Sequence, residues 1–440
     1  MKKYRQEKSR LFLQDPLTGG YNREGFLRMC RKLLEKKGDS EYAIACLNIC
    51  DFRYINEQWG ADIGNKVLKL VYQVLKEKTG KKELVCRSNM DRFLLLLDEK
   101  TEINISSRIT DMIETVNEII HEKILYYNVE FYIGICMLSM EKNIEKAIGK
   151  GILVRKQNRE KNVCKFYDLE IERKMKEEQE INALFAESIK NHDFKIYFQP
   201  KVSDSGACHA EALVRWIHPE RGILYPDQFI SLFEASGKIY ELDLYVFEEV
   251  CRIVSEKLKT QKEYMKISLN VSRFTILNGG GKIWEKYRAI KEKYGISDDT
   301  LEVELTENIF VDDRQIAYIQ TLLQEFHACG LKIALDDFGF AYSSLFLLKE
   351  FDIDTIKMDK RFFIDENKKS REIVKAIIQL AHNLGMCVVA EGIEEKEQVK
   401  VLQENGCDFI QGYIYSKPLS LEKFDLWKKE WENGAFQFHK

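Results

Sequence analysis

Short apolar runs recur through the second half of the chain, and amphipathic stretches with a helical period separate them. The runs are KIYFQP (195–200), AEALVRW (210–216), MKISLNVS (265–272), LEVELTE (301–307), KIALDDFG (332–339), TIKMDK (355–360), CVVAEGI (387–393) and DFIQGY (408–413). Each run is short and apolar enough for a buried strand. Strands that alternate with helices in this way predict a TIM-type (α/β) barrel.

A highly charged stretch without Gly or Pro, LEIERKMKEEQEINALFAESIK (169–190), precedes the first run. It spaces Ile181, Leu184, Phe185 and Ile189 like one face of a helix, so it predicts a linking helix. Two roles are open for this helix: a solvated helix that docks on the following domain, or a signalling helix that transmits a state between domains.

The pattern divides the chain into four parts. We expect an N-terminal helix or extension over 1–14, a first domain over 15–168, the linking helix over 169–190 and a barrel domain over 191–435.

Polar or charged residues stand at or near the C-terminal end of every strand-like run. They are Gln199, Glu211 with Arg215, Asn270, Glu304 with Glu307, Asp336 with Asp337, Lys357, Glu391 with Glu394, and Gln411. The C-terminal strand ends of a barrel converge on one face, so we expect these residues to form a single site. The adjacent carboxylates of Asp336 and Asp337 repel each other and resist burial, which predicts a divalent cation at this place.

The residue types of this set restrict its chemistry. Oxygen ligands favour Mg²⁺ or Mn²⁺, one or two ions, and no Ser–His or Cys–His pair suggests a covalent nucleophile. Arg215 and Lys357 can neutralise a phosphate or the charge that builds on it. Metal-assisted phosphodiester hydrolysis is the natural class, and an enolising or aldol-type metal enzyme is the alternative from these features alone.

The segment Glu211-Ala212-Leu213, followed by Val214-Arg215, resembles the E-A-L-x-R signature of the EAL family, the cyclic di-GMP phosphodiesterases. The resemblance covers the second half of the chain and includes Y-F-Q-P, L-N-V-S, E-L-T-E, D-D-F-G, I-K-M-D, A-E-G-I-E and Q-G-Y. It implies that the domain binds cyclic di-GMP and cleaves it to the linear dinucleotide pGpG.

The same resemblance implies a metal-ligand set. Glu211, Asn270, Glu304 and Asp336 would hold one metal ion, and Asp337 would bridge to a second. Carboxylate and amide oxygens are the ligands that such hard cations accept.

Further roles follow from the resemblance. Lys357 would position or activate the attacking water, Glu391 would act at the metal site as ligand or base, and Glu307 would hold the loop after Asp337. The implied substrate contacts are Gln199, Arg215 at a phosphate, and Gln411, which would orient water or substrate.

One departure from the family's pattern lies in the loop after Asp337. Family members usually read D-D-F-G-[small]-G-Y-S-S, and this chain has Phe340 and Ala341 there. Alanine restricts a backbone that needs a positive φ, and Phe340 adds an apolar group beside the metal site or at a partner surface. The ligands are kept, so we expect activity, with its rate or regulation dependent on this loop.

Residues 15–168 resemble a GGDEF domain, the family that makes cyclic di-GMP from two GTP molecules. The opening segment DPLTGGYNR (15–23) is similar to the family's D-x-L-T-G-L-x-N-R, and Phe52, Ile55-Asn56 and Gly60 match a second segment. The resemblance implies a cyclase- or palm-like α/β sandwich with an antiparallel-rich central sheet.

The residues that carry the cyclase chemistry are replaced. The signature G-G-D-E-F aligns with Asn89-Met90-Asp91-Arg92-Phe93, so side chains stand where glycines let the backbone approach phosphates. Asn48 and Cys50 replace two aspartates of the metal site, and Arg92 replaces an acidic residue. Further replacements are Gln157 for a phosphate-binding lysine, and Gly80 with Glu83 in the product-inhibition motif. We predict no cyclase activity and no inhibitory-site binding.

The first domain is then a regulatory or scaffolding module. Asn56 keeps a guanine-contacting position, whereas Asn65 replaces the aspartate at the other one. GTP binding therefore stays open beside a plain dimerisation or interaction surface. The resemblance also implies a homodimer through the EAL domain.

Composition adds exclusions. The net charge of -3 gives no bulk attraction to nucleic acid or anionic membranes, and no apolar run approaches the length of a membrane span. Eleven scattered cysteines without a Cys-x-x-Cys pair indicate reduced core thiols and a cytoplasmic protein. The competing hypotheses are a receptor that binds cyclic di-GMP without cleaving it, and a scaffold that binds no nucleotide.

Overall fold

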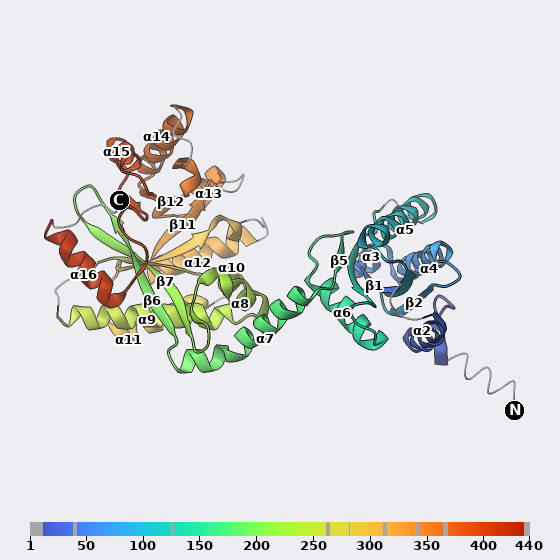
Figure 1. Ribbon diagram of the computed structural model, residues 1–440. Coiled ribbons are helices and arrows are strands. Elements are labelled where there is room, and N and C mark those ends of the chain that lie inside the picture. The colour runs from blue at the N-terminus through green and yellow to red at the C-terminus, as the bar shows by residue number, and fades with distance from the viewer. Residues whose placement is uncertain are drawn as a thin grey trace. The chain divides into compact units, whose positions relative to one another are not determined.

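The computed structural model describes residues 12–37, 42–124, 127–260, 265–280, 282–310, 315–339, 344–363 and 368–434, except the side chains of residues 36, 37, 308, 310, 344 and 368. The chain divides into two compact units, Met1–Glu177 and Glu178–Lys440 (Figure 1). Each unit has hydrophobic core of its own.

A five-stranded sheet in the order β2–β3–β1–β4–β5 forms the centre of the first unit. Its strands are β1 (Tyr42–Ile49), β2 (Leu84–Asn89), β3 (Arg92–Asp98), β4 (Phe131–Met137) and β5 (Cys164–Phe166). All neighbours are antiparallel except β4 and β5, which are parallel. The expected antiparallel-rich α/β sandwich is therefore confirmed.

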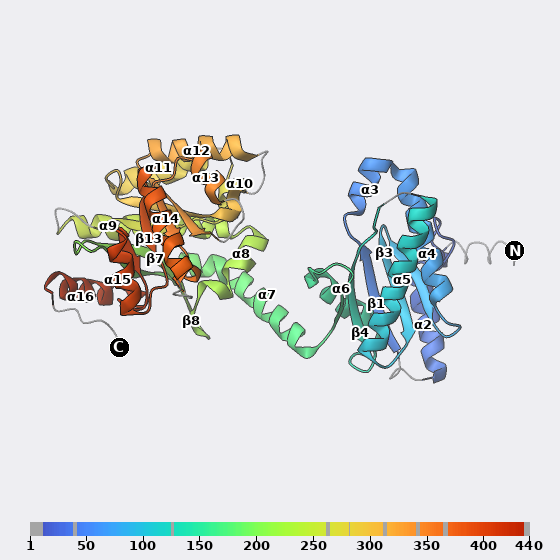
Figure 2. The ribbon, with the colours of Figure 1, turned by 90° about the horizontal axis from the view of Figure 1, so that it is seen from above.

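Two layers of helices cover this sheet. They are α2 (Arg23–Lys37), α3 (Phe52–Trp59), α4 (Ala61–Lys78), α5 (Glu102–Lys123) and α6 (Ile144–Gln157). Alternate residues of β1 point to opposite faces: Ala45 and Leu47 pack with α4 and α5, whereas Ile44 and Cys46 pack with α2 and α6. Figure 2 shows α6 on one side of the sheet and α4 and α5 on the other.

The charged stretch before the barrel forms α7 (Leu169–Lys190). Ile181 and Phe185 are buried in the core of the second unit, and Leu184 and Ile189 pack against that core. The apolar face thus docks on the second unit, which is the first of the two roles considered for this helix. Transmission of a signal along α7 stays a prediction.

Eight strands close a barrel in the second unit, and each apolar run supplies one of them. In order around the barrel they are β6 (Phe194–Val202), β7 (Cys208–His218), β9 (Ile267–Asn270), β10 (Leu301–Thr306), β11 (Lys332–Phe338), β12 (Thr355–Met358), β13 (Cys387–Ala390) and β14 (Phe409–Gln411). Strands β7 to β14 are parallel, but β6 is antiparallel to both of its neighbours. The TIM-type barrel is confirmed, with one reversed strand.

The reversal of β6 corrects one expectation from the sequence. Gln199 does not belong to a C-terminal strand end that points toward the site, because β6 ends at Val202 beside the start of β7 at Cys208. Only a short turn joins β6 to β7, and such a connection forces the two strands to be antiparallel. Gln199 reaches the site from within β6, where it pairs with Glu211.

Helices surround the barrel (Figures 1 and 2). They are α8 (Ile230–Ser236), α9 (Ile239–Leu258), α10 (Arg273–Asn278), α11 (Ile283–Tyr294), α12 (Ile316–Ala328), α13 (Ser344–Glu350), α14 (Lys368–Asn383), α15 (Lys396–Glu404) and α16 (Leu421–Glu432). Two short strands, β8 (Gly222–Leu224) and β15 (Leu419–Ser420), extend the sheet, and 3-10 turns follow at η1 (Pro226–Gln228), η2 (Glu307–Phe310) and η4 (Lys360–Phe363).

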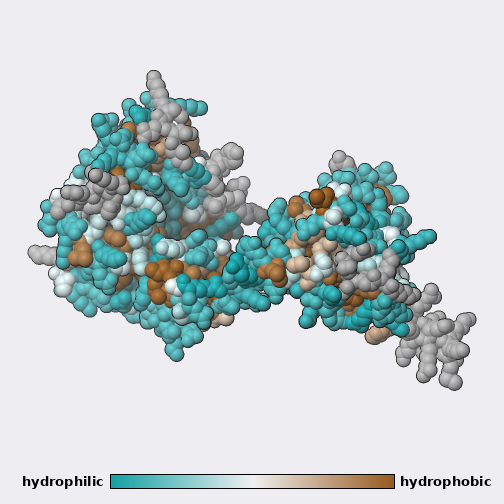
Figure 3. All heavy atoms as spheres, in the orientation of Figure 1, coloured by the Kyte–Doolittle hydropathy of each residue, from teal (hydrophilic) through white to brown (hydrophobic). Residues whose placement is uncertain are grey.

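The surface is mostly hydrophilic on the face shown in Figure 3, where hydrophobic residues gather in small patches. Across the described ranges, every helix is too short or too polar to cross a bilayer. All eleven cysteines are free thiols, buried or half-buried.

Candidate functional site

The ammonium group of Lys357, on β12, lies among four carboxylates inside the barrel. Its Nζ is 2.5 Å from Glu304 Oε2, 2.7 Å from Glu391 Oε1, 3.2 Å from Asp336 Oδ1 and 3.6 Å from Glu211 Oε2. Lys357 is 1% exposed. Four parts of the barrel, at β7, β10, β11 and the end of β13, therefore bring one acidic side chain each to a single lysine.

These groups shift one another's pKa values. Burial works against the charge on Lys357, but the surrounding carboxylates raise its pKa well above the ordinary value. Burial also raises the pKa of Glu304, yet Lys357 and Lys201 together lower it to about 2. Glu211 has its pKa raised to about 7, mainly by burial and by the charge of Glu304. Burial raises the pKa of Glu391 well above its usual range. The site thus holds more acidic groups than one ammonium can neutralise.

Two amide side chains hold Glu211. Asn270 Nδ2 lies 2.8 Å from Glu211 Oε1, and Gln411 Nε2 donates to Glu211 Oε2 at 2.6 Å. Asn270 Nδ2 is also 3.3 Å from Glu304 Oε2, and Gln411 Nε2 is 3.3 Å from Gln199 Oε1. Within the described ranges, the buried Oε1 atom of Gln411 accepts no hydrogen bond. Gln199, Asn270 and Gln411 therefore lie with the acidic cluster, as the sequence predicted.

A bulge in β11 places the two adjacent aspartates. The register between β11 and β12 shifts between Leu335 and Phe338, and Asp337 adopts a φ of 57°, in the left-handed region. In a regular strand two consecutive side chains point to opposite faces, and a bulge changes that direction locally. Burial and the charge of Asp336 raise the pKa of Asp337.

Glu307 connects η2 to the end of β11. Its Oε1 accepts a hydrogen bond from the backbone N–H of Gly339 at 2.8 Å. Gly339 has a φ of 96°, and a Cβ there would lie 2.3 Å from the ring of Phe362, so glycine is required. The sequence departure at Phe340 and Ala341 lies outside the described residues.

Arg215 lies between two tyrosine rings near the end of β7. Its guanidinium carbon is 5.2 Å from the ring centre of Tyr225 and 5.7 Å from that of Tyr197. Arg215 is 8% exposed and donates to the carbonyl oxygen of Val214 at 2.8 Å. No carboxylate among the described residues forms an ion pair with it, so its charge can meet an anionic ligand.

Sequence reasoning missed three polar residues, of which Lys201 and Glu302 lie by the acidic cluster and Asp243 lines a separate cavity. Lys201 and Glu302 lie beneath Glu304. Asp243, on α9, accepts hydrogen bonds from Ser272 and lines a cavity of about 590 Å³ beside Asn270. Lys201 follows Gln199 by two residues, and Glu302 precedes Glu304 by two. Residues with this spacing lie on the same face of a strand, and this was the signal available in the sequence. Glu394, in contrast, is exposed.

The donor set fits a hard divalent cation. Within the described ranges, no three His, Cys, Asp or Glu side chains already form a metal-binding group, and the Lys357 ammonium lies between the carboxylates. Buried carboxylates with raised pKa values are nevertheless groups that a cation would stabilise in their charged form. The residues that could hold it are Glu211, Asn270, Glu304, Asp336 and Asp337.

In the first unit, two guanidinium groups lie where the resemblance to the GGDEF family implies a metal site. Asn48, at the end of β1, lies with its Oδ1 3.3 Å from Arg92 Nε and 3.4 Å from Arg155 Nη1. Burial raises the pKa of the Cys50 thiol to about 11, which keeps it neutral. Met90, in the hairpin turn between β2 and β3, has a φ of 46° and an exposed side chain. The amide of Asn48, which takes the place of an aspartate in the family's pattern, thus lies beside two guanidinium groups.

Glu83 is satisfied within the first unit. Arg108, on α5, donates to both of its oxygens, at 2.7 and 2.8 Å. The backbone N–H groups of Gly80 and Asp98 also donate to this carboxylate. Burial works against its charge, but Arg108 lowers the pKa of Glu83.

Two family models match the chain. The model of the EAL domain matches residues 182–418, which is more than half of the chain, and the model of the diguanylate cyclase GGDEF domain matches residues 12–151.

Curated relatives carry similar sequences. The cyclic di-GMP phosphodiesterase NbdA of Pseudomonas aeruginosa is 29% identical over 423 residues, covering 92% of this chain and 53% of NbdA. The cyclic di-GMP phosphodiesterase PdeR of Escherichia coli is 26% identical over 438 residues, covering 98% of this chain and 65% of PdeR. The chain therefore spans between about half and two thirds of the length of these relatives. Another relative, MucR of Pseudomonas aeruginosa, is 23% identical and is named a bifunctional diguanylate cyclase and phosphodiesterase.

Solved structures share the fold. The PaMucR phosphodiesterase in complex with c-di-GMP has a TM-score of 0.51 and 28% identity, covering 56% of this chain and 99% of that one. The S helix-GGDEF-EAL structure of Vibrio cholerae LapD has a TM-score of 0.51 and 19% identity over 94% of this chain and 98% of its own. The second likeness shows a common fold alone.

Proposed function

This chain belongs to the EAL domain family and carries a GGDEF domain before its EAL domain, and from this premise we propose that it hydrolyses cyclic di-GMP to pGpG with Mg²⁺ or Mn²⁺. The observation that carries the proposal is the set of four carboxylates and two amides around Lys357 at one end of the barrel. Two relatives named cyclic di-GMP phosphodiesterases support the substrate.

In this reaction a water oxygen forms a bond to phosphorus, a P–O bond to ribose breaks, and the leaving oxygen takes up a proton. Glu211, Asn270, Glu304, Asp336 and Asp337 would hold the metal. A divalent cation bound there would neutralise charge on the phosphodiester and make a nearby water more acidic.

The remaining polar side chains bind and orient. Arg215 contacts a phosphate, since its buried charge has no acidic partner among the described residues. Gln199 contacts the nucleotide, and Gln411 presents to water or substrate its Oε1, which has no hydrogen-bond partner among the described residues. Lys357 and Glu391, whose charged groups are 2.7 Å apart, position the attacking water, and the Glu391 carboxylate receives its proton.

For the first unit we propose a regulatory or dimerisation role without cyclase activity. Arg92 and Arg155 beside Asn48 repel the metal ions that such chemistry requires. Glu83 is held by Arg108, so the inhibitory motif offers no free carboxylate to a ligand. GTP binding by this unit, a homodimer through the EAL domain and a cytoplasmic location stay predictions.

The test is to incubate the purified full chain with cyclic di-GMP and Mg²⁺ or Mn²⁺, with and without GTP, and to separate the products by chromatography. Appearance of pGpG supports the proposal, and a rate that depends on GTP gives the first unit a regulatory role. Binding of cyclic di-GMP without product identifies a receptor, and reversion of Phe340 and Ala341 is then the next step. Absence of nucleotide binding at both domains identifies a scaffold.

A further inference from the structure

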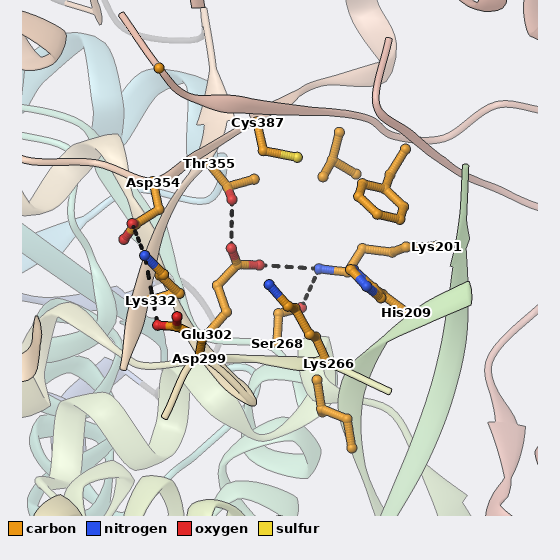
Figure 4. A pocket seen from close by; sticks show the side chains of 14 residues that line it. Lys201, His209, Lys266, Ser268, Asp299, Glu302, Lys332, Asp354, Thr355 and Cys387 are labelled. Atoms are coloured by element: carbon orange, nitrogen blue, oxygen red, sulfur yellow. Dashed lines mark hydrogen bonds and ion pairs between the residues drawn. The ribbon is translucent and has the colours of Figure 1, made fainter. Parts of the chain in front are cut away.

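A second polar cavity, of about 240 Å³, lies at the opposite end of the barrel from the acidic cluster. Residues at the beginnings of the parallel strands line it, including Ser268, Glu302, Thr355 and Cys387. Figure 4 shows Lys201 extending into this cavity from β6, toward Ser268 and Glu302. Polar groups at this end of a barrel usually serve stability, so a link to catalysis requires specific contacts.

Lys201 makes those contacts although it is only 3% exposed. Its Nζ donates to Ser268 Oγ at 2.6 Å and lies 3.4 Å from Glu302 Oε2 and 3.4 Å from Glu304 Oε1. The buried ammonium of Lys201 therefore lies close to two carboxylates: that of Glu302, which lines this second cavity, and that of Glu304, which belongs to the acidic cluster.

Glu304 is thus held between two lysines. Lys201 approaches Oε1, whereas Lys357 and Asn270 approach Oε2, at 2.5 and 3.3 Å. Only Oε2 points toward the other acidic side chains around Lys357. The reversed direction of β6 makes this possible, because it carries Lys201 past Gln199 toward the far end of the barrel.

We propose that Lys201 is a positioning residue for the phosphodiesterase reaction: it holds Glu304 Oε1 from below, so that Glu304 presents Oε2 alone to the metal. This inference rests on the proposed function. Without Lys201, Lys357 is the one cation among the described residues that lies beside Glu304, and Oε1 loses the ammonium that holds it. The carboxylate would then be drawn away from the metal, and Glu302 would lose its buried counter-charge.

The experiment compares three variants of the full chain. Lys201→Met removes the ammonium group and keeps an apolar stem of similar length. Ser268→Ala removes the hydroxyl that accepts from Lys201 and that also hydrogen-bonds to Glu304, so it weakens the support of Glu304 from the same side. Thr355→Val is the matched control, since it removes a buried hydroxyl that donates to Glu302 at 2.6 Å in the same cavity and does not touch Glu304.

We expect Lys201→Met to lower kcat about 10-fold or more and to weaken Mn²⁺ binding by a similar factor, as loss of a residue that orients a metal ligand does. The KM for cyclic di-GMP should stay within about twofold, because the substrate face lies at the other end of the barrel. Ser268→Ala should move both quantities in the same direction by a smaller factor, and Thr355→Val should leave them unchanged. Mn²⁺ binding is measured by electron paramagnetic resonance without substrate, and melting temperatures are recorded for all variants.

Two outcomes overturn the inference. If Lys201→Met and Ser268→Ala fold and match Thr355→Val in kcat and Mn²⁺ affinity, Lys201 has only a structural role. If the wild-type chain neither binds Mn²⁺ nor forms pGpG, the proposed function fails and this inference fails with it. Where Lys201→Met does not fold, Lys201→Gln, which also removes the charge, takes its place in the comparison with Thr355→Val.

Discussion

Lys357 keeps its charge at 1% exposure because four carboxylates surround it, and those carboxylates remain in the barrel because Lys357 offsets part of their charge. A buried charge without a partner is costly, so each member of the cluster depends on the others. Burial and charge give chemically identical groups different properties: the pKa of Glu304 is about 2, and that of Glu211 is about 7.

Loss of the Glu211 carboxylate tests the metal site at this scale. We expect Glu211→Ala to lower the rate of pGpG formation at least about 100-fold, since several kcal/mol of transition-state stabilisation by the metal are lost. Glu394→Ala is a suitable control, because Glu394 follows the same strand-end pattern but is exposed. Chromatographic rates at saturating Mg²⁺ measure the effect. Undiminished turnover in Glu211→Ala would refute the proposed ligand set.

At the scale of elements, the same hydrogen-bonding arrangement around an aspartate occurs twice in the barrel and joins a helix to two strands. Asp354, before β12, accepts from His327 Nε2 at the end of α12 and from the backbone N–H of Ile333 in β11. Asp408, before β14, does the same with His382 at the end of α14 and with Val388 in β13. The repetition holds successive helix–strand units in register at the end of the barrel opposite the acidic cluster.

The hydrogen bond between His327 and Asp354 makes the free energy of unfolding depend on pH. The hydrogen bond to Asp354 raises the pKa of His327 above its ordinary value of 6.5, although burial opposes this shift. The stabilisation is therefore complete below about pH 6.5 and is lost as the pH rises through the raised pKa. We expect wild type to be less stable to urea at about pH 9 than at about pH 6, and His327→Leu to remove part of that difference. An unchanged difference in the variant would contradict the assignment.

Another element-scale contact is the hydrogen bond from Gly339 to Glu307, which ties η2 to the end of the bulged strand β11. Glu307→Gln keeps the size of the side chain and an acceptor oxygen but removes the charge. We expect a fall in kcat of about 10-fold with a melting temperature close to wild type, because a loop-orienting contact is weakened without loss of packing. Equal loss of activity and stability would instead indicate a general structural role.

At the scale of the whole molecule, the two domains differ in the side chains that lie where their families would bind metal. The second unit brings every implied ligand and substrate contact of the EAL family to one end of a closed barrel, from strands far apart in the sequence. The first unit keeps the sandwich of a GGDEF domain, but Asn48, Arg92 and Arg155 meet where metal ligands would be required. A shared fold does not by itself confer an activity, so the residues at this site decide what the first unit can catalyse.

This difference between the two units predicts that the protein hydrolyses cyclic di-GMP but does not synthesise it. We expect the full chain to form no cyclic di-GMP from GTP with Mg²⁺ or Mn²⁺, since Asn48 and Cys50 stand in place of acidic metal ligands and two arginines lie beside Asn48. Chromatography after long incubation with GTP measures it, and Glu211→Ala must be included so that hydrolysis cannot hide a product. Accumulation of cyclic di-GMP in that variant would overturn the prediction.

The sequence alone was sufficient for the eight strands of the barrel, the helix over 169–190 and the family of both domains. Apolar runs, helical periods and motif spacings are local properties, and each needs only neighbouring residues to be read. The residues around Lys357 were also named from sequence, because motifs at strand ends mark one face of a barrel.

Only the tertiary structure decided the direction of β6, the bulge at Asp337 and the place of Lys201 beneath Glu304. These features depend on pairing and packing between residues far apart in the sequence, such as Lys201 with Glu304 and Val202 with Ile410. The sequence around Lys201 does not show that this lysine is buried. The closed barrel excludes water from its side chain and places two carboxylates, Glu302 and Glu304, beside it. The physical reason is that the charge of a buried group is set by its spatial neighbours, which a linear pattern does not specify.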